Sequence, residues 1–142
     1  AGSLREGEQA AKRYPDRPRV TVEATTVDKA LQEHPPDFVP MMKIAVRGFE
    51  YHVLLGAMRT LQRTHTVWFE CNTHLLVPFR EVAAFLDRQG FLTYKVAHGG
   101  LIKVYGPYWD DVFDGHALDH NCLAIRKGSP LLAQVGIACN NR

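Results

Sequence analysis

The chain has 142 residues, of which 46% are hydrophobic and 23% are charged, and its formal net charge is +2 at pH 7. This composition predicts one globular domain with a buried core and excludes general disorder, while the mild charge gives no nucleic-acid-binding signature. No apolar run approaches the roughly 20 residues that span a bilayer, and no signal-peptide core opens the chain, so we expect a soluble domain.

The first segment, residues 1–19, is predicted to be a polar lead-in. It has glycines and prolines among charged residues and no sustained apolar period, so we expect it to contribute no core. Residues 20–142 are predicted to form the domain. A strand is expected to start at Val20, and Thr26 can cap a short helix that follows it.

Residues 40–72 are the centre of the predicted domain, and they contain a strand, a helix and a second strand. The short apolar run within residues 41–46 is typical of a strand that is covered on both faces. Apolar residues then recur at helical spacing, which predicts one helix over residues 49–63. The strand pattern resumes at residues 67–69. Two strands joined by such a helix are expected to be parallel, in a right-handed crossover.

The later part of the chain is predicted to contain a helix, a hairpin, a loop and a last strand. These are a helix that begins with Pro78 and ends at Gly90 as a left-handed cap, a hairpin of residues 91–96 and 101–105, a loop over residues 106–120 and a strand over residues 122–126. Residues 131–138 fit a strand and a helix equally well.

The chain has three cysteines, Cys71, Cys122 and Cys139. The number is odd and two of them fall in predicted strands, where a free cysteine behaves as a small hydrophobic residue. We therefore expect free thiols, and a reducing compartment or an organelle interior rather than secretion.

Three short motifs carry a family resemblance. They are Lys-Ile-x-Val-x-Gly-Phe-Glu over residues 43–50, Val-Leu-x-Gly-Ala over residues 53–57, and Phe69-Glu70. Together they resemble the second half of the FkbM-type methyltransferases, class I enzymes that use S-adenosylmethionine. The resemblance, which extends over residues 20–128, implies an α/β fold with a mostly parallel sheet and flanking helices. That fold is the carboxyl half of a Rossmann-like class I methyltransferase.

Four residues stand at positions of the family motif: Lys43, Gly48, Glu50 and Glu70. For Glu70, at the carboxyl end of a strand, a role in the site and a structural bond to loop amides are equal alternatives. Glu50 is expected only to interact with a helix dipole. Lys43 is expected to be a buried strand residue without a catalytic role. No residue is therefore assigned to catalysis.

The chain departs from the family motif at the carboxyl end of the strand predicted within residues 41–46. Family members carry acidic residues where this chain has Ala45 and Arg47. Alanine cannot act as a base and arginine reverses the charge, so the change argues against catalysis. The chain also lacks a strand followed by a glycine-rich turn and a helix. We therefore expect no cofactor for this chain alone, and S-adenosylmethionine only if it is part of a longer enzyme.

Three functions are left open. The first is a degenerate FkbM-type domain that acts as a structural or interaction subunit of a larger assembly, with a protein partner on its open sheet edge. The second is a fragment of an active S-adenosylmethionine-dependent O-methyltransferase. The third is a metal-binding domain, because His116 and His120 lie four residues apart among carboxylates. Gly115 weakens a helix there, however, and the spacing fixes no third ligand.

Overall fold

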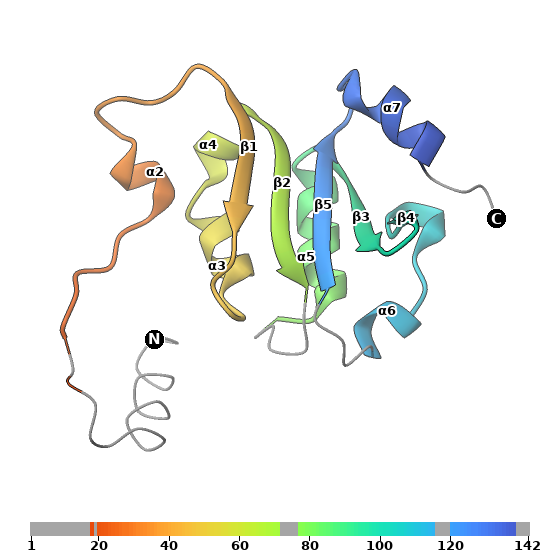
Figure 1. The fold of residues 1–142 in the computed structure, drawn as a ribbon. Coiled ribbons are helices and arrows are strands. Elements are labelled where there is room, and N and C mark those ends of the chain that lie inside the picture. Colours follow the sequence, from red (N-terminus) through yellow and green to blue (C-terminus); the bar gives the residue numbers. More distant parts are fainter. Residues whose placement is uncertain (1–17, 19, 72–76, 116–119, 139–142) are drawn as a thin grey trace.

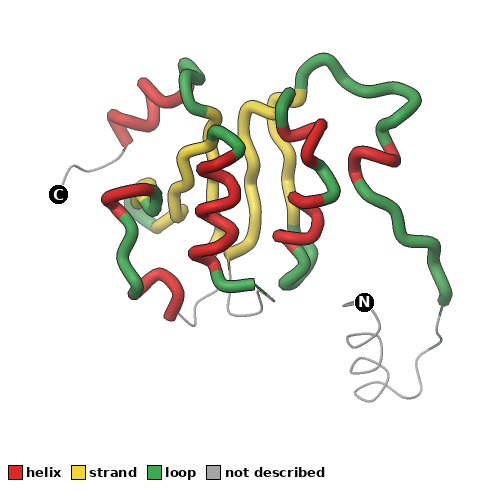
Figure 2. The backbone as a smooth tube through the Cα atoms, turned by 180° about the vertical axis from the view of Figure 1, so that it is seen from behind, coloured by secondary structure: helices red, strands yellow, loops and turns green. Residues whose placement is uncertain are grey.

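The computed structural model describes residue 18 and residues 20–71, 77–115 and 120–138. Its strands are β1 (Val39–Ile44), β2 (Thr64–Cys71), β3 (Phe91–Ala97), β4 (Gly100–Lys103) and β5 (His120–Arg126). Its helices are α2 (Val27–Ala30), α3 (Glu50–Leu55), α4 (Met58–Leu61), α5 (Phe79–Arg88), α6 (Val112–Gly115) and α7 (Leu131–Ala138), with a 3-10 turn, η1, at Gly106–Tyr108. The fold is a mixed α/β fold in which α3, α4 and α5 cover one face of a five-stranded sheet (Figures 1 and 2).

The sheet has the strand order β1-β2-β5-β3-β4. As predicted, β1 and β2 are parallel, but the other three strand pairs are antiparallel. The prediction of a mostly parallel sheet is therefore wrong, and the sheet is mixed and mostly antiparallel. The reason is that β5, the last strand, inserts between β2 and β3 and runs against both. Consequently β1, β2 and β3 point in the same direction, although only one neighbouring pair is parallel.

Strand β1 lies at an edge of the sheet. Ile44 is buried, whereas Met41 is 54% exposed and Lys43 is also exposed. The predictions that this strand is covered on both faces and that Lys43 is buried are therefore wrong. The physical reason is that, among the described residues, β1 has one neighbouring strand and helices pack against one of its faces.

The single helix predicted over residues 49–63 is interrupted after Gly56, which separates α3 from α4. At the break, the amide of Asp28 donates to the carbonyl of Gly56 over 2.9 Å. The carboxylate of Asp28 then accepts from the amides of Arg59 and Thr60, at 2.8 and 2.9 Å. These are the free amides of the first turn of α4, so a residue distant in sequence supplies its amino-terminal cap.

Four other predictions of local structure can be compared directly with the observed fold. The Thr26 cap is confirmed, because its hydroxyl accepts from the Lys29 amide over 3.2 Å. Gly90 is confirmed as the left-handed end of α5, with a φ of 84°. The β3–β4 hairpin is also confirmed. The strand predicted at Val20 is wrong: this residue is 82% exposed and lies outside every strand of the described chain. Leu131–Ala138 is a helix.

The main core lies between the sheet and helices α3 to α5. Its largest fully buried apolar residues are Phe69, Phe91, Leu54, Leu61, Leu86, Val67, Val82 and Val104. The opposite face carries a smaller cluster in which Leu132 and Val135 of α7 pack around Tyr94 and Ile125. Thus α7 covers one side of that face, over β3 and β5, while no described helix lies over β1 and β2 (Figure 1).

Candidate functional site

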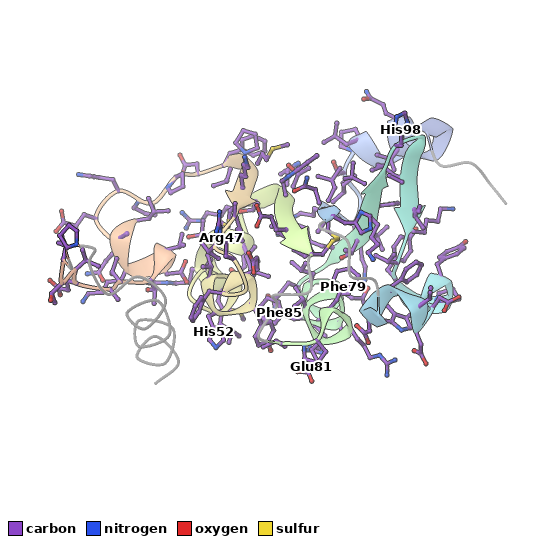
Figure 3. The ribbon with its side chains drawn as sticks, turned by 60° about the horizontal axis from the view of Figure 1, so that its bottom comes forward. Arg47, His52, Phe79, Glu81, Phe85 and His98 are labelled. Atoms are coloured by element: carbon purple, nitrogen blue, oxygen red, sulfur yellow. A yellow bond between two sulfur atoms is a disulfide. The ribbon has the colours of Figure 1, made fainter. Side chains whose placement is uncertain are left out.

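The carboxyl ends of β1 and β2 meet at the same edge of the sheet, because these strands are parallel. Open α/β sheets bind ligands beyond such strand ends. Figure 3 views the molecule from this end, with Arg47 and His52 beside α3, and Phe79 and Phe85 on the neighbouring helix α5. The exposed His98 lies at the β3–β4 turn, on the other side of the sheet from Arg47 and His52. The family motif residues can be located relative to this edge.

Gly48 and Glu50 are brought together in the loop that follows β1. The Glu50 side chain is fully buried, and its carboxylate accepts from the amides of Val46 and Gly48, at 3.1 and 2.8 Å. Gly48 has a φ of 105°, a conformation that side chains other than glycine rarely allow. Glu50 stands in the first turn of α3, as expected, and its carboxylate has a structural role beyond the helix dipole, because it also bonds two amides of the loop.

Ala45 and Arg47 occupy the same loop and are both exposed. Arg47 has a φ of 48°, so two successive residues of the loop are in left-handed conformations. The only carboxylate of this loop region, that of Glu50, is already bonded to two amides. Beyond the end of β1 the chain therefore presents a methyl group and a guanidinium group, and neither can serve as a general base at neutral pH.

Lys43 and Glu70 lie away from Glu50, on the other face of the sheet. Side chains alternate between the two faces of a strand, and Phe69, which precedes Glu70, belongs to the core beneath the helices. In the ladders, Lys43 is paired with Trp68 of β2, and Glu70 is paired with Asn121 of β5. The structure thus brings Gly48 and Glu50 together and separates them from Lys43 and Glu70.

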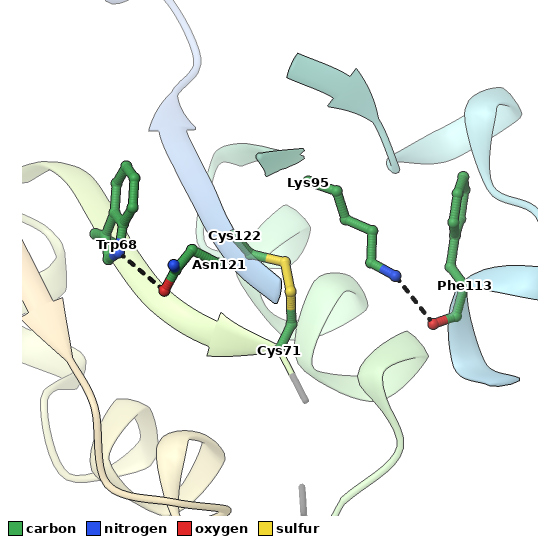
Figure 4. The surroundings of a disulfide bond; sticks show 6 residues. All are labelled: Trp68, Cys71, Lys95, Phe113, Asn121 and Cys122. Atoms are coloured by element: carbon green, nitrogen blue, oxygen red, sulfur yellow. Dashed lines mark hydrogen bonds between the residues drawn. A yellow bond between two sulfur atoms is a disulfide. The ribbon is translucent and has the colours of Figure 1, made fainter. Parts of the chain in front are cut away.

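A disulfide joins Cys71 of β2 to Cys122 of β5 (Figure 4). The prediction of free thiols at these two positions is wrong. Both cysteines lie in strands, as predicted, but β5 pairs directly with β2 and brings the two side chains into bonding distance, with their Cα atoms 6.0 Å apart. The argument for a reducing compartment rested on free thiols and loses its basis.

Lys95 is a buried charged residue that sequence analysis missed. It is 6% exposed, it is paired with Cys122 in the β3–β5 ladder, and its Nζ atom donates to the Phe113 carbonyl over 3.4 Å (Figure 4). The same Nζ atom lies 5.5 and 5.3 Å from the ring centres of Phe79 and Phe113. Burial lowers the pKa of Lys95, while the charge of Asp114 acts in the opposite direction.

A small cavity of about 120 Å³ lies between α2 and α4. Its lining residues are Asp28, Leu31, Gln32, Pro35, Pro36, Arg59, Thr60 and Arg63. Both arginines already have partners: Arg59 lies 3.8 Å from the Asp28 carboxylate, and Arg63 donates to the Pro36 carbonyl over 3.0 Å. None of the lining residues belongs to the family motif, so this cavity is separate from the edge formed by β1 and β2.

The metal hypothesis concerned His116 and His120. His116 lies outside the described residues, and His120 is the first residue of β5, paired with Cys71. Across the part of the chain that the structure describes, no group of three or more His, Cys, Asp or Glu side chains could hold a metal ion. In that same part, none of the helices combines the length and apolar character needed to cross a membrane.

Comparison with known proteins identifies the family. The model of the methyltransferase FkbM domain matches residues 2–93, a range that contains all four motif residues named above. The match begins within the segment predicted as a lead-in and ends in β3, so β5 lies outside it. No curated protein and no solved structure matches the chain. Because the matched residues make up more than half of the sequence, the chain belongs to the FkbM methyltransferase domain family.

Proposed function

We propose that this domain acts as a structural or interaction subunit of a larger assembly and does not itself catalyse methyl transfer. The observation that carries the proposal is the edge position of β1. Parallel strand pairs are normally buried, and an uncovered strand edge invites pairing with another chain. Met41, on this strand, is 54% exposed, and Val46 just beyond it is 39% exposed. A protein partner at this edge would remove both the apolar surface and the unpaired backbone groups from water.

The sheet supports a more specific assignment of its ancestry. We propose that it corresponds to the carboxyl half of a Rossmann-like class I methyltransferase domain. In support, β1, β2 and β3 run in one direction, and β1 and β2 are connected through α3 and α4. β5 is the reversed strand between β2 and β3. On this assignment, β1 is the strand that would adjoin the cofactor-binding half.

The residues of the β1 loop support the absence of catalysis. S-adenosylmethionine needs close backbone approach at a glycine-rich turn and a carboxylate that accepts from its ribose hydroxyls. Glu50 is fully buried and engaged by two amides, which leaves it unfit for that task. Ala45 and Arg47 provide no replacement. We therefore propose that this chain alone binds no S-adenosylmethionine.

The alternative is that the chain is part of an active S-adenosylmethionine-dependent O-methyltransferase, in which other residues bind the cofactor. Its support is family membership, together with the intact loop in which Gly48 and Glu50 are bonded. Against it stand Ala45 and Arg47, because a longer chain would supply a glycine-rich turn without changing these two side chains.

Calorimetric titration of the chain with S-adenosylmethionine tests this proposal. We expect no binding heat for the chain, and none for the double variant Ala45→Asp/Arg47→Glu, because restoring acidic groups does not create a glycine-rich turn. Stoichiometric binding at micromolar concentration by the unmodified chain would overturn the proposal and support the alternative. Binding by the double variant alone would show that those two substitutions abolished an otherwise competent site.

A further inference from the structure

The Cys71–Cys122 disulfide has two basic residues beside it in the strand ladders. Cys122 is paired with Lys95 of β3, and Cys71 is paired with His120, the first residue of β5. Residues that are paired directly in an antiparallel ladder point to the same face of the sheet, with their Cβ atoms about 4.5–5.5 Å apart. The disulfide therefore has a lysine and a histidine as neighbours on the face that α5 covers, and Figure 4 shows the Lys95 side chain beside it.

The buried ammonium group of Lys95 has no counter-charge of its own. No ion pair joins it to another described residue, and its hydrogen bond to the Phe113 carbonyl is long, at 3.4 Å. Asp114 acts on it electrostatically, but this carboxylate is engaged by Arg80: it accepts from the Arg80 amide over 3.0 Å and lies 3.5 Å from Nε. An ammonium group has three donors, so within the described chain two of them are left without an acceptor.

A hydroxyl group on the same face also lacks a partner. Thr93 stands two residues before Lys95 in β3, so strand alternation puts both side chains on one face. Its Oγ1 atom is buried and has no hydrogen-bond partner among the described residues. In the β3–β5 ladder, Lys95 lies opposite Cys122 and Thr93 lies opposite Ala124, two residues further along. Two groups with unused donors thus flank Cys122, and unused donors favour a negative charge on that sulfur.

We infer that the Cys71–Cys122 pair is a redox-active site that exchanges with small thiols, and that Lys95 holds the thiolate released at Cys122. A disulfide is uncharged and leaves the buried ammonium group uncompensated, whereas a thiolate compensates it. Thiolates are stabilised beside Lys, Arg and protonated His side chains. The inference goes beyond the proposed function, because it concerns a bond within the chain and neither the β1 edge nor S-adenosylmethionine.

Thiol–disulfide exchange would begin at Cys71, which is the last residue of β2 and is 5% exposed, whereas Cys122 is fully buried. The thiolate of an external dithiol bonds to the Cys71 sulfur, the Cys71–Cys122 bond breaks, and its electron pair leaves on Cys122. The second thiol of the reductant loses its proton and displaces Cys71, which takes up a proton. The dithiol is thereby oxidised to a disulfide. The chain gains two electrons and one proton, and Cys122 is left as the thiolate.

Equilibration with dithiothreitol and the ultraviolet absorbance of the thiolate test the inference. All chains carry Cys139→Ser, so that only the two thiols of the site are measured. In the reduced chain we expect thiolate absorbance from one cysteine at neutral pH, and its loss in Lys95→Met, which removes the charge. Lys95→Met should also shift the equilibrium toward the disulfide by about tenfold, the factor for one unit of proton affinity. Lys95→Arg keeps the charge and should behave like the unmodified site.

Lys29→Met, at an exposed position of α2, is the matched control and should change neither measurement. The other charged groups around the site, His120 of β5, Asp114 of α6 and Arg80 of α5, are the same in every variant, so the comparison isolates Lys95. Circular dichroism measures whether the reduced chains are folded.

Three outcomes would overturn the inference. They are a reduced site whose thiolate absorbance does not exceed that of Lys95→Met, an equilibrium that Lys95→Met does not shift, and a reduced chain that is unfolded, because no folded site would then hold the thiolate. None of these measurements depends on a protein partner or on S-adenosylmethionine. A failure here would therefore leave the proposed function standing, and a failure of the proposed function would leave this site standing.

Discussion

Replacing Glu50 tests whether this motif residue serves the fold. In Glu50→Ala, the amides of Val46 and Gly48 lose their acceptor, and the Gly48 bond is buried. A hydrogen bond to a charged group contributes about 1.5–3 kcal/mol, and the cost is incurred in full where the donor stays buried. We therefore expect the free energy of unfolding to fall by about 3 kcal/mol. For Glu50→Gln we expect the free energy of unfolding to fall by about half as much, because the remaining side-chain oxygen can still accept one of the two hydrogen bonds.

Urea denaturation followed by circular dichroism measures these differences. Glu33→Ala is the matched control, because this glutamate is exposed and lies outside the helices and strands. It should change the free energy of unfolding by no more than about 0.5 kcal/mol. If Glu50→Ala were as stable as the control, the carboxylate would not be holding the loop, and a functional role for Glu50 would have to be reconsidered.

Three further substitutions or treatments have defined outcomes. Asp28→Ala should lower the free energy of unfolding by about 1 kcal/mol at neutral pH, as for a lost helix cap. Burial raises the pKa of Asp28, but the hydrogen bonds from Arg59 and Thr60 and the positive charge of Arg59 outweigh burial and hold this pKa below its usual value. The difference measured by urea denaturation should therefore disappear as the pH falls through that lowered pKa. Reduction of the Cys71–Cys122 bond, which links positions 51 residues apart, should cost about 4 kcal/mol, and thiol titration before reduction should find one free thiol per chain. A chelator should leave the melting temperature unchanged, whereas a fall reversed by zinc would support a metal site at His116 and His120.

Features encoded by neighbouring residues could be predicted from the sequence. The Thr26 cap, the left-handed Gly90 and the β3–β4 hairpin each depend on a few consecutive residues, because capping and turn geometry are local. The parallel pairing of β1 and β2 could also be predicted, since a strand, a helix and a strand of this length allow one common connection.

Features that depend on distant residues could not be predicted. Nothing local shows that β5 inserts beside β2, and this one pairing changes the character of the sheet and creates the Cys71–Cys122 disulfide. The break between α3 and α4 likewise depends on Asp28, about thirty residues away. The apolar spacing alone continued through the break, so periodicity predicted one helix.

The candidate site was predictable in part. The motif identified Gly48 and Glu50, and the bond between them explains why both residue types are needed at that spacing. Lys95 was missed because a lysine within a strand is usually placed on the exposed face. The alternation of β3 contained a clue, since it puts Lys95 on the same face as the buried Phe91.

Sedimentation velocity of the chain over a wide concentration range tests the central claim, that β1 needs a protein partner, most directly. We predict association that keeps increasing with concentration, and its loss in Met41→Lys, because an added charge on an edge strand opposes pairing. Ile102→Lys, at an exposed position of the short strand β4 at the opposite edge, is the control and should not prevent association. A chain that is monomeric at every concentration, with no partner present, would contradict the account.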